Sequence, residues 1–495
     1  MLRAFEADAS REAGDSFLAL VARYLEGTRA GDGPVSTSLP PAALAARFDE
    51  PLPVGGLPLE EVVERVERDV VADANRLMHP MSMGHQVSPP LPAAIWTDAL
   101  ISAINQSVAV SEMSPTGTAI ETTVVRWMCA LAGWGAGAGG TLTSGGTEAT
   151  FTALLAARAA ALPDAWEEGV GDDPPVVLCG EHSHYAVTRA VGELGLGMRR
   201  AIAIPSRGWR MDAGALAAAL ERLGSEGRRV MAVVATAGST ATGSFDDLDA
   251  IGELCERHGV WLHVDGAHGA SALLSPSQRH RLRGIERARS IAWDPHKMML
   301  MPLPAGMLLV REERDLERAF AQRAPYLFHG AGAAERVWDQ GVRSFMCSRR
   351  ADAIKVWVAL QRYGADGIGA LYDHLCATTR ALHAQIAARG DFEALHEPES
   401  NILCFRYTGP HAPHDGDPAA ADDFQRELRE RWNRSGRGWI TATVLGGRRV
   451  LRVTIMNPRT TPAHTAAMLA GLAEMAAGMA AERQAGAPER RRPAG

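Results

Sequence analysis

Lys297 and Lys355 are the only lysines in this chain of 495 residues, and arginine supplies the other basic positions. A lysine amine can be tuned to act as a nucleophile, whereas an arginine guanidinium stays protonated. Lys297 closes the segment Trp-Asp-Pro-His-Lys after a short apolar run, where partial removal from water would leave more of the amine neutral. A lysine that reaches from a loop to solvent is the alternative. Lys355 follows Asp352 by one turn of an amphipathic helical pattern, which is typical of a structural ion pair.

A segment rich in glycine and hydroxyl side chains, residues 143–150 (TSGGTEAT), precedes a strongly helix-forming stretch. Helix amino termini carry free N–H groups and a partial positive charge, which favour a phosphate. Gly146 would let a phosphate approach the backbone, and Thr147 adds a hydroxyl. The segment matches neither of the common glycine-rich nucleotide motifs. It is therefore either a phosphate site or an ordinary helix cap.

Asp265 ends the apolar run WLHVD and is followed by small residues that leave space above it. A carboxylate there would stabilise a buried cation such as a protonated pyridine nitrogen, or it would cap the following turn. A metal site built from His263, Asp265 and His268 ranks lower, because neighbouring residues on a strand point to opposite faces. His184 follows the apolar run VVLCG, so it is expected near the same edge of the sheet.

The elements that would position these residues are short apolar runs that alternate with helical stretches between residues 100 and 365. This alternation predicts an α/β fold with a mostly parallel sheet and helices on both faces, and ligands bind such sheets where the strands end. The predicted strands are VVLCG, AIAIP, VMAVVATAG, WLHVDG, SIAWD and AGMLLVR.

The pattern divides the chain into four parts. Residues 1–85 have apolar residues at helical spacing around a Pro/Gly-rich connector, which predicts a helical segment that packs on a partner subunit. Residues 86–365 are predicted to form the large domain that carries the site. Residues 366–482 predict a smaller α+β domain, and residues 483–495 predict a disordered tail.

Composition excludes several classes of partner. A formal net charge of -7 gives no basic field that would hold nucleic acid or anionic lipid. No run approaches the about 20 apolar residues that span a bilayer, and the amino terminus lacks the apolar core of a signal peptide, so a cytoplasmic location is expected. The six cysteines form no C-x-x-C pair, which favours reduced thiols over disulfides or a zinc site.

Taken together, the motifs resemble those of the group II amino-acid decarboxylases, which depend on pyridoxal 5′-phosphate (PLP). This family contains the glutamate, aromatic-amino-acid, cysteine-sulfinate and 2,4-diaminobutyrate decarboxylases. The matching motifs, in family order between His79 and Pro458, are TSGGTEAT, HYAVTRA, HVDGAHGAS, DPHK, CSRRADAIKVW and LRVTIMNP. The resemblance implies the fold of type I PLP enzymes (aspartate-aminotransferase-like), with residues 86–365 as the PLP-binding domain, and a homodimer with active sites at the subunit interface. It also implies that an L-amino acid is converted to its amine and CO2.

The resemblance further implies a role for each matching residue. Lys297 would carry PLP as a Schiff base, Asp265 would pair with the pyridine nitrogen, and His184 would stack on the ring and take part in catalysis. The other cofactor contacts would come from Gly146, Thr147, Thr240, Ala267 and His296, and the substrate contacts from Gln86 and Arg452. No metal is implied.

One departure from the family concerns a loop tyrosine that usually precedes the C-S-R-R motif. Residues 329–340 contain no tyrosine, and Ala334 stands at the matching position. Simple decarboxylation is the first hypothesis. Oxidative decarboxylation to an aldehyde is the alternative that this loss implies, and a non-catalytic interaction protein is a third, although the joint presence of Lys297, Asp265 and His184 argues against it. The substrate is left open, and the surroundings of Tyr326 and Gln340 resemble the glutamate, cysteine-sulfinate and diaminobutyrate branch more than the aromatic one.

Overall fold

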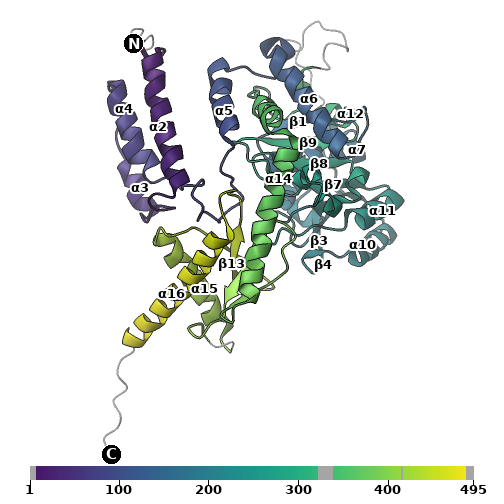
Figure 1. Ribbon diagram of the computed structural model, residues 1–495. Coiled ribbons are helices and arrows are strands. Elements are labelled where there is room, and N and C mark those ends of the chain that lie inside the picture. Colours follow the sequence, from purple (N-terminus) through teal and green to yellow (C-terminus); the bar gives the residue numbers. More distant parts are fainter. Residues whose placement is uncertain (1–6, 321–337, 414–415, 487–495) are drawn as a thin grey trace, which may run out of the picture. The chain divides into compact units, whose positions relative to one another are not determined.

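The computed structural model describes residues 7–320, 338–413 and 416–486 (Figure 1). These residues fall into two compact units. The large unit contains Gln86–Ala377 and Pro398–Ile402, and the second unit contains Met1–His85, Thr378–Glu397 and Leu403–Gly495. Ala334 and Tyr326, which bear on the loop tyrosine and on the substrate branch, lie outside the described residues.

Within the described residues, the large unit is built on a seven-stranded sheet of order β1-β9-β8-β7-β6-β2-β3. Strand β9 runs antiparallel to β1 and β8, whereas the remaining neighbouring pairs are parallel. The predicted α/β fold with a mostly parallel sheet is therefore confirmed. The strands are β1 (Gly139–Thr143), β2 (Val176–Gly180), β3 (Ala201–Ile204), β6 (Val230–Thr236), β7 (Trp261–Asp265), β8 (Ser290–Trp293) and β9 (Gly306–Val310).

Helices cover this sheet, and α7 packs directly on it (Figure 1). Ala149 and Ala153 of α7 contact Ala292 of β8 and Leu308 of β9, because the small alanines let the helix approach the strands closely. The contact fixes where α7 begins relative to the strand ends. The larger helices of this unit are α5 (Pro92–Ile104), α6 (Pro115–Leu131), α7 (Gly146–Ala161), α9 (Ala186–Glu193), α10 (Ala213–Ser225), α11 (Leu248–His258), α12 (Arg314–Ala319) and the first part of α14 (Ala353–Ala387).

The second unit combines helices with a sheet of order β10-β11-β13-β12. The Pro/Gly-rich connector that the sequence predicts is residues 40–58, and one helix, α3, lies within it, so that part of the prediction is wrong. Pro41 presets the backbone at the first helical position and the following alanines favour a helix. The elements are α2 (Arg11–Ala30), α3 (Pro41–Arg47), α4 (Leu59–Val66), β10 (Phe392–Ala394), β11 (Ile402–Tyr407), α15 (Pro418–Arg434), β12 (Thr441–Leu445), β13 (Arg448–Thr454) and α16 (Pro462–Gly486).

No helix among the residues described is both long and apolar enough to cross a membrane. Helix α16 continues to Gly486, and the rest of the predicted tail lies outside the described residues.

The structural reading of Lys355 is confirmed. Its side chain is fully buried, with Nζ 3.0 Å from Asp352 Oδ1 and 2.9 Å from Asp98 Oδ1. Two carboxylates hold this ammonium group, so its charge is compensated inside the protein.

A buried ion pair ties β1 to the rest of the large unit. The Glu121 carboxylate on α6 accepts hydrogen bonds from Arg349 Nη1 (2.9 Å) and Nη2 (2.6 Å). It also accepts one from the N–H of Leu142 in β1 (3.0 Å). Glu121→Ala leaves Arg349 buried without its carboxylate, so we expect the free energy of unfolding to fall by about 3–5 kcal/mol in urea denaturation. The matched control is Glu226→Ala, which breaks an exposed pair with Arg222 and should cost less than about 1 kcal/mol. Equal losses in the two variants would contradict this prediction.

Candidate active site

A cavity of about 400 Å³ lies at the edge of the large unit's sheet where β2, β6, β7 and β8 end. The carboxyl ends of parallel strands meet at one edge of a sheet, and ligands bind there in α/β folds. Eight of the ten predicted site residues line this cavity. They are Lys297, His184, Asp265, Gly146, Thr147, Thr240, Ala267 and His296.

Gln86 and Arg452 do not line the cavity. Gln86 is half-buried in the large unit, and its Nε2 has no hydrogen-bond partner among the residues described. Arg452 lies on β13 in the second unit, where burial lowers the pKa of its guanidinium. Their predicted contacts with a substrate therefore remain predictions.

Size alone does not single out this cavity. One of about 410 Å³ lies at the opposite edge of the same sheet and is lined by Arg228, Arg229, His258 and Arg289. Arg229 donates to the Ala161 carbonyl at the end of α7, so this arginine caps a helix there. The cavity at the carboxyl ends of the strands is the one that combines a lysine with carboxylates and histidines.

Lys297 lies in the turn that follows β8, with one-fifth of its side chain exposed. Its Nζ is 3.4 Å from Asp294 Oδ2, and His296 Nε2 is 3.4 Å from the same oxygen. Burial raises the pKa of the Asp294 carboxyl, but Lys297, His296 and the Gly146 N–H together lower it by more. The pKa of Asp294 is therefore below its usual value. Asp294 is not among the predicted site residues, although its place three residues before Lys297 in the sequence could have indicated it.

Backbone hydrogen bonds fix which ring nitrogen carries the proton in two histidines of the cavity. Ala186 N–H donates to His184 Nδ1 (3.2 Å), and Ala305 N–H donates to His296 Nδ1 (3.1 Å). A nitrogen that accepts a hydrogen bond carries no proton, so each neutral ring holds its proton on Nε2. Burial lowers the pKa of His184, and the nearby Lys297 adds to that effect although Asp265 opposes it. His184 is therefore neutral at pH 7.

Asp265 is the last residue of β7 and is held between β6 and β8 by the strand register. Its Oδ1 accepts the N–H of Ala267 (3.2 Å), so it also caps the following turn. Two residues earlier, His263 is fully buried, and burial lowers its pKa to about 4. Its Nδ1 lies 2.9 Å from Ser290 Oγ. Asp265 thus brings a negative charge to the cavity that no charged histidine on its own strand offsets at pH 7.

The metal alternative for this strand finds no geometric support. His268 Nε2 pairs with Asn401 Oδ1 at 2.7 Å, and His263 pairs with Ser290. In the parts of the chain that the structure describes, no group of three or more His, Cys, Asp or Glu side chains could hold a metal ion.

The amino terminus of α7 closes one side of the cavity. No side chain caps this end at Gly145, and the N–H of Gly146 donates to Asp294 Oδ2 (3.0 Å). A methyl group at Gly146 would come within 2.8 Å of the Ala267 Cβ and 3.1 Å of Asp294 Oδ2. Backbone N–H groups, the Thr147 hydroxyl and the Nε2–H of His296 make this end suitable for a phosphate. We call the group formed by Gly146, Thr147 and His296 the helix-end cradle.

Known proteins are similar to this chain in both sequence and fold. Residues 41–408 match the model of the pyridoxal-dependent decarboxylase conserved domain. The chain is 34% identical over 414 residues to L-2,4-diaminobutyrate decarboxylase of Rhizobium meliloti (strain 1021), covering 83% of this chain and 81% of the relative. It is 34% identical over 374 residues to cysteine sulfinic acid decarboxylase of Mus musculus, covering 75% of each. The crystal structure of mouse CSAD in apo form superposes with a TM-score of 0.89 at 29% identity, covering 96% of this chain and 99% of that one.

Proposed function

The chain belongs to the pyridoxal-dependent decarboxylase family and catalyses the PLP-dependent decarboxylation of an L-amino acid, and we propose that Lys297 carries the cofactor in the cavity at the end of β8. One observation carries this assignment. The cavity unites Lys297 with Asp265, His184 and the amino terminus of α7. Lys355, the other lysine of the chain, is buried against two carboxylates.

The residues that the sequence predicts for the site fit the cofactor in charge and in space. The helix-end cradle would hold the phosphate, because Gly146 keeps the space beside Ala267 open and the helix terminus supplies N–H groups. Asp265 would pair with the pyridine nitrogen, whose protonated form a buried carboxylate favours. Ala267 would pack on one face of the ring and His184 on the other, with Thr240 close to the ring or to His184.

Bound PLP supplies an electron sink for the pair left on the substrate when the carboxylate departs as CO2. Asp265 would favour a positive charge on the ring nitrogen, which this chemistry needs. His184, a neutral Nε2–H donor in the cavity, orients the substrate so that the Cα–carboxylate bond is the one that breaks. Lys297 holds the cofactor between turnovers and moves a proton at its Nζ.

The relatives suggest a substrate with a short, charged side chain. They are named for L-2,4-diaminobutyrate and cysteine sulfinic acid, and a third from Bos taurus, 33% identical over 374 residues, is named an acidic amino acid decarboxylase. This agrees with the branch that the sequence around residues 326–340 favours. Gln86 and Arg452 are the candidates for contacts to that substrate.

A second product is the specific alternative. The sequence has no tyrosine between Tyr326 and Tyr363, where family members usually carry the loop tyrosine, and this favours oxidative decarboxylation to an aldehyde as the competing reaction. Dioxygen would then be the oxidant and peroxide its reduced product.

The test is to incubate the PLP-loaded protein with a panel of L-amino acids and to measure CO2, amine, aldehyde and peroxide together. We expect CO2 with an equal amount of amine from 2,4-diaminobutyrate, cysteine sulfinate, aspartate or glutamate. Aldehyde with peroxide would establish the oxidative reaction instead. The absence of CO2 from every amino acid would overturn the proposed assignment.

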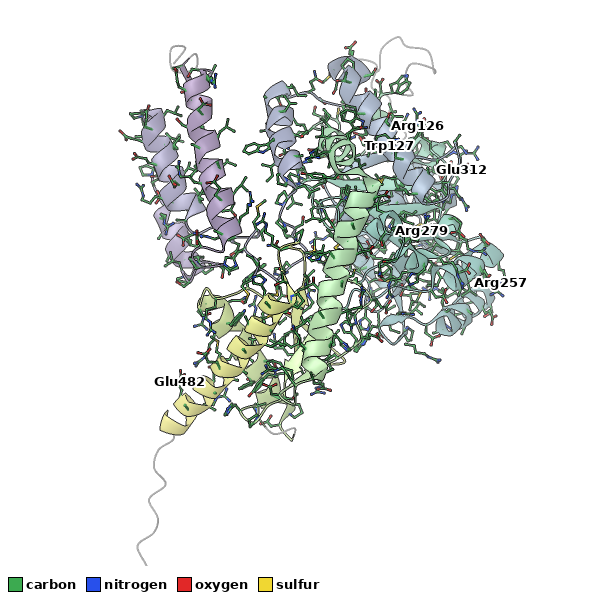
Figure 2. The ribbon with its side chains drawn as sticks, in the orientation of Figure 1. Arg126, Trp127, Arg257, Arg279, Glu312 and Glu482 are labelled. Atoms are coloured by element: carbon green, nitrogen blue, oxygen red, sulfur yellow. The ribbon has the colours of Figure 1, made fainter. Side chains whose placement is uncertain are left out.

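We further propose a cytoplasmic homodimer in which residues 1–85 pack on the partner subunit. Three apolar side chains spaced four residues apart on α5 are partly exposed, namely Trp96 (43%), Leu100 (56%) and Ile104 (41%). Trp127 on α6 of the same unit is 38% exposed (Figure 2). A row of exposed apolar side chains marks a protein interface more often than free surface. Light scattering after gel filtration should give a molar mass twice that of the chain. Leu100→Asp should lower the measured mass toward that of the monomer.

Gly146→Ala tests the helix-end cradle. The added methyl group would stand 2.8 Å from the Ala267 Cβ, so either the α7 terminus or the turn after Asp265 must move away from the phosphate. We expect the affinity for PLP to fall by about tenfold or more, and the overpacking should also lower the free energy of unfolding of the protein by about 1–3 kcal/mol. The matched control is Gly135→Ala, which meets nothing within 4 Å and should leave the PLP affinity unchanged. Unchanged PLP binding by Gly146→Ala would place the phosphate elsewhere.

A further inference from the structure

Asp294 occupies the place that an anion would take in the cavity. Its Oδ2 accepts the N–H of Gly146 at 3.0 Å and lies 3.4 Å from both Lys297 Nζ and His296 Nε2. The residue is 1% exposed, and its Oδ1 has no hydrogen-bond partner among the described residues. Three donors thus converge on one carboxylate oxygen.

Two of these donors belong to the helix-end cradle. Gly146 N–H at the start of α7 and His296 Nε2–H are the groups that would hold the phosphate of PLP. While Asp294 accepts the Gly146 N–H, that donor is directed at the carboxylate and is not available to a phosphate. Asp294 and the phosphate therefore draw on the same hydrogen-bond donors.

The charges around Asp294 do not remove this conflict. The groups that face it are Lys297 Nζ, His296 Nε2 and the Gly146 N–H, and the same cavity holds the Asp265 carboxylate and the neutral His184 ring. Lys297 and His296 hold the pKa of Asp294 below its usual range, so the carboxylate is ionised at neutral pH. A phosphate monoester carries about -1.5 to -2 charges at pH 7. Two anions would then share one buried site with a single ammonium group.

We propose that Asp294 is an affinity-determining residue that competes internally with the phosphate of the cofactor and so makes cofactor binding weaker and more readily reversible. This inference rests on the proposed placement of PLP in the same cavity. The carboxylate holds the Gly146 N–H that the phosphate would need, and its Oδ2 lies 3.4 Å from Lys297 Nζ. When the phosphate binds, Asp294 gives up the Gly146 N–H and remains as a buried charge close to the new anion.

Asparagine separates this role from a purely structural one. The side-chain oxygen of asparagine can still accept the Gly146 N–H, so the turn between β8 and Lys297 keeps its hydrogen bond. The change removes the negative charge and nearly nothing else. A structural role alone predicts unchanged or weaker cofactor binding in Asp294→Asn, whereas internal competition predicts tighter binding.

The experiment measures binding of pyridoxine 5′-phosphate and of pyridoxine to the purified full-length protein by calorimetry. Neither compound has an aldehyde, so neither forms a bond to Lys297, and the two differ only in the phosphate. We expect Asp294→Asn to bind pyridoxine 5′-phosphate about tenfold or more tightly than the natural protein, with the pyridoxine affinity unchanged. Asp294→Ser, also neutral, repeats the test if the asparagine variant folds poorly.

The matched control is Glu148→Gln. Glu148 lies in the first turn of the same helix and accepts the Ser144 N–H at 2.9 Å, but it does not line the cavity. Removal of its charge should change the affinity for pyridoxine 5′-phosphate much less than Asp294→Asn does, because the effect of Asp294 requires direct contact with the cradle.

Two results would overturn the inference in different ways. If the natural protein binds pyridoxine 5′-phosphate but Asp294→Asn binds it equally or less tightly, Asp294 does not compete with the phosphate. If neither protein binds the phosphorylated compound better than pyridoxine, the cavity holds no phosphate, and the proposed placement of the cofactor fails as well.

Discussion

Lys297→Ala is expected to abolish the visible absorption of the lysine-bound cofactor and to lower decarboxylation at least about 10⁴-fold, the scale of loss seen when one member of a catalytic unit is removed. The physical reason is that no other amine of a described side chain lies in the cavity. The variant should fold, because one-fifth of the Lys297 side chain is exposed and its shortening leaves Asp294 in contact with Gly146 and His296. Absorption spectra of the PLP-treated protein and single-turnover CO2 release measure the two effects.

Lys355→Met is the matched control, since the chain offers one other lysine. It leaves Asp98 and Asp352 without their buried ammonium partner, so the protein should lose stability while the visible absorption is retained. The opposite pattern, with an absorption band in Lys297→Ala that survives borohydride reduction, would move the cofactor to Lys355 and refute the assignment.

Asp265→Asn is expected to lower kcat by about 10²–10³-fold while PLP still binds and still absorbs in the visible range. The amide keeps the shape of the side chain and can still accept the Ala267 N–H, which Asp265 receives at 3.2 Å. It cannot supply the negative charge that favours a protonated pyridine nitrogen. The separation of kcat from cofactor binding distinguishes Asp265 from Lys297, for which both should be lost.

A buried carboxylate outside the cavity provides the comparison for Asp265. Asp246 accepts the N–H groups of Met211 and Thr236 at 2.7 Å each, and burial raises its pKa to about 6. Asp246→Asn should reduce thermal stability, because an amide cannot accept both N–H groups equally well, but it should lower kcat much less. Similar kcat losses in the two variants would mean that Asp265 acts through the fold rather than through its charge.

The sequence predicted the strands whose side chains are mostly apolar. The runs that form β2, β6, β7 and β8 are buried almost throughout, so apolar residues dominate them and polar residues such as Thr236, Asp265 and Ser290 stand mainly at their ends. Strand β1, with the sequence GGTLT, has no such signal. A Cβ at Gly140 would lie 2.3 Å from the Leu308 carbonyl oxygen, so glycine is required there by the neighbouring strand, which local sequence does not reveal.

The site could be predicted where its residues follow strand ends, since topology brings those ends together. His184, Asp265 and Lys297 follow β2, β7 and β8 in this way. The position of Asp294 three residues before Lys297 hints at the site, but its contact with Gly146 joins positions 148 apart and is not visible in the local sequence. Gln86 and Arg452 were assigned by resemblance alone, and no strand end of the large sheet fixes their positions.

The backbone amides of Ala186 and Ala305, which donate to His184 and His296, also limit which side chains of the cavity can take up and release a proton. A neutral imidazole that is protonated on Nε2 is a hydrogen-bond donor but not an acid of useful strength, and a second proton could be added only by displacing the amide from Nδ1. While these hydrogen bonds hold, neither ring has a free Nδ1 lone pair with which to take up a proton. Proton transfer in the cavity then falls to side chains other than these two rings, and among them Lys297 has its Nζ 3.4 Å from the Asp294 carboxylate.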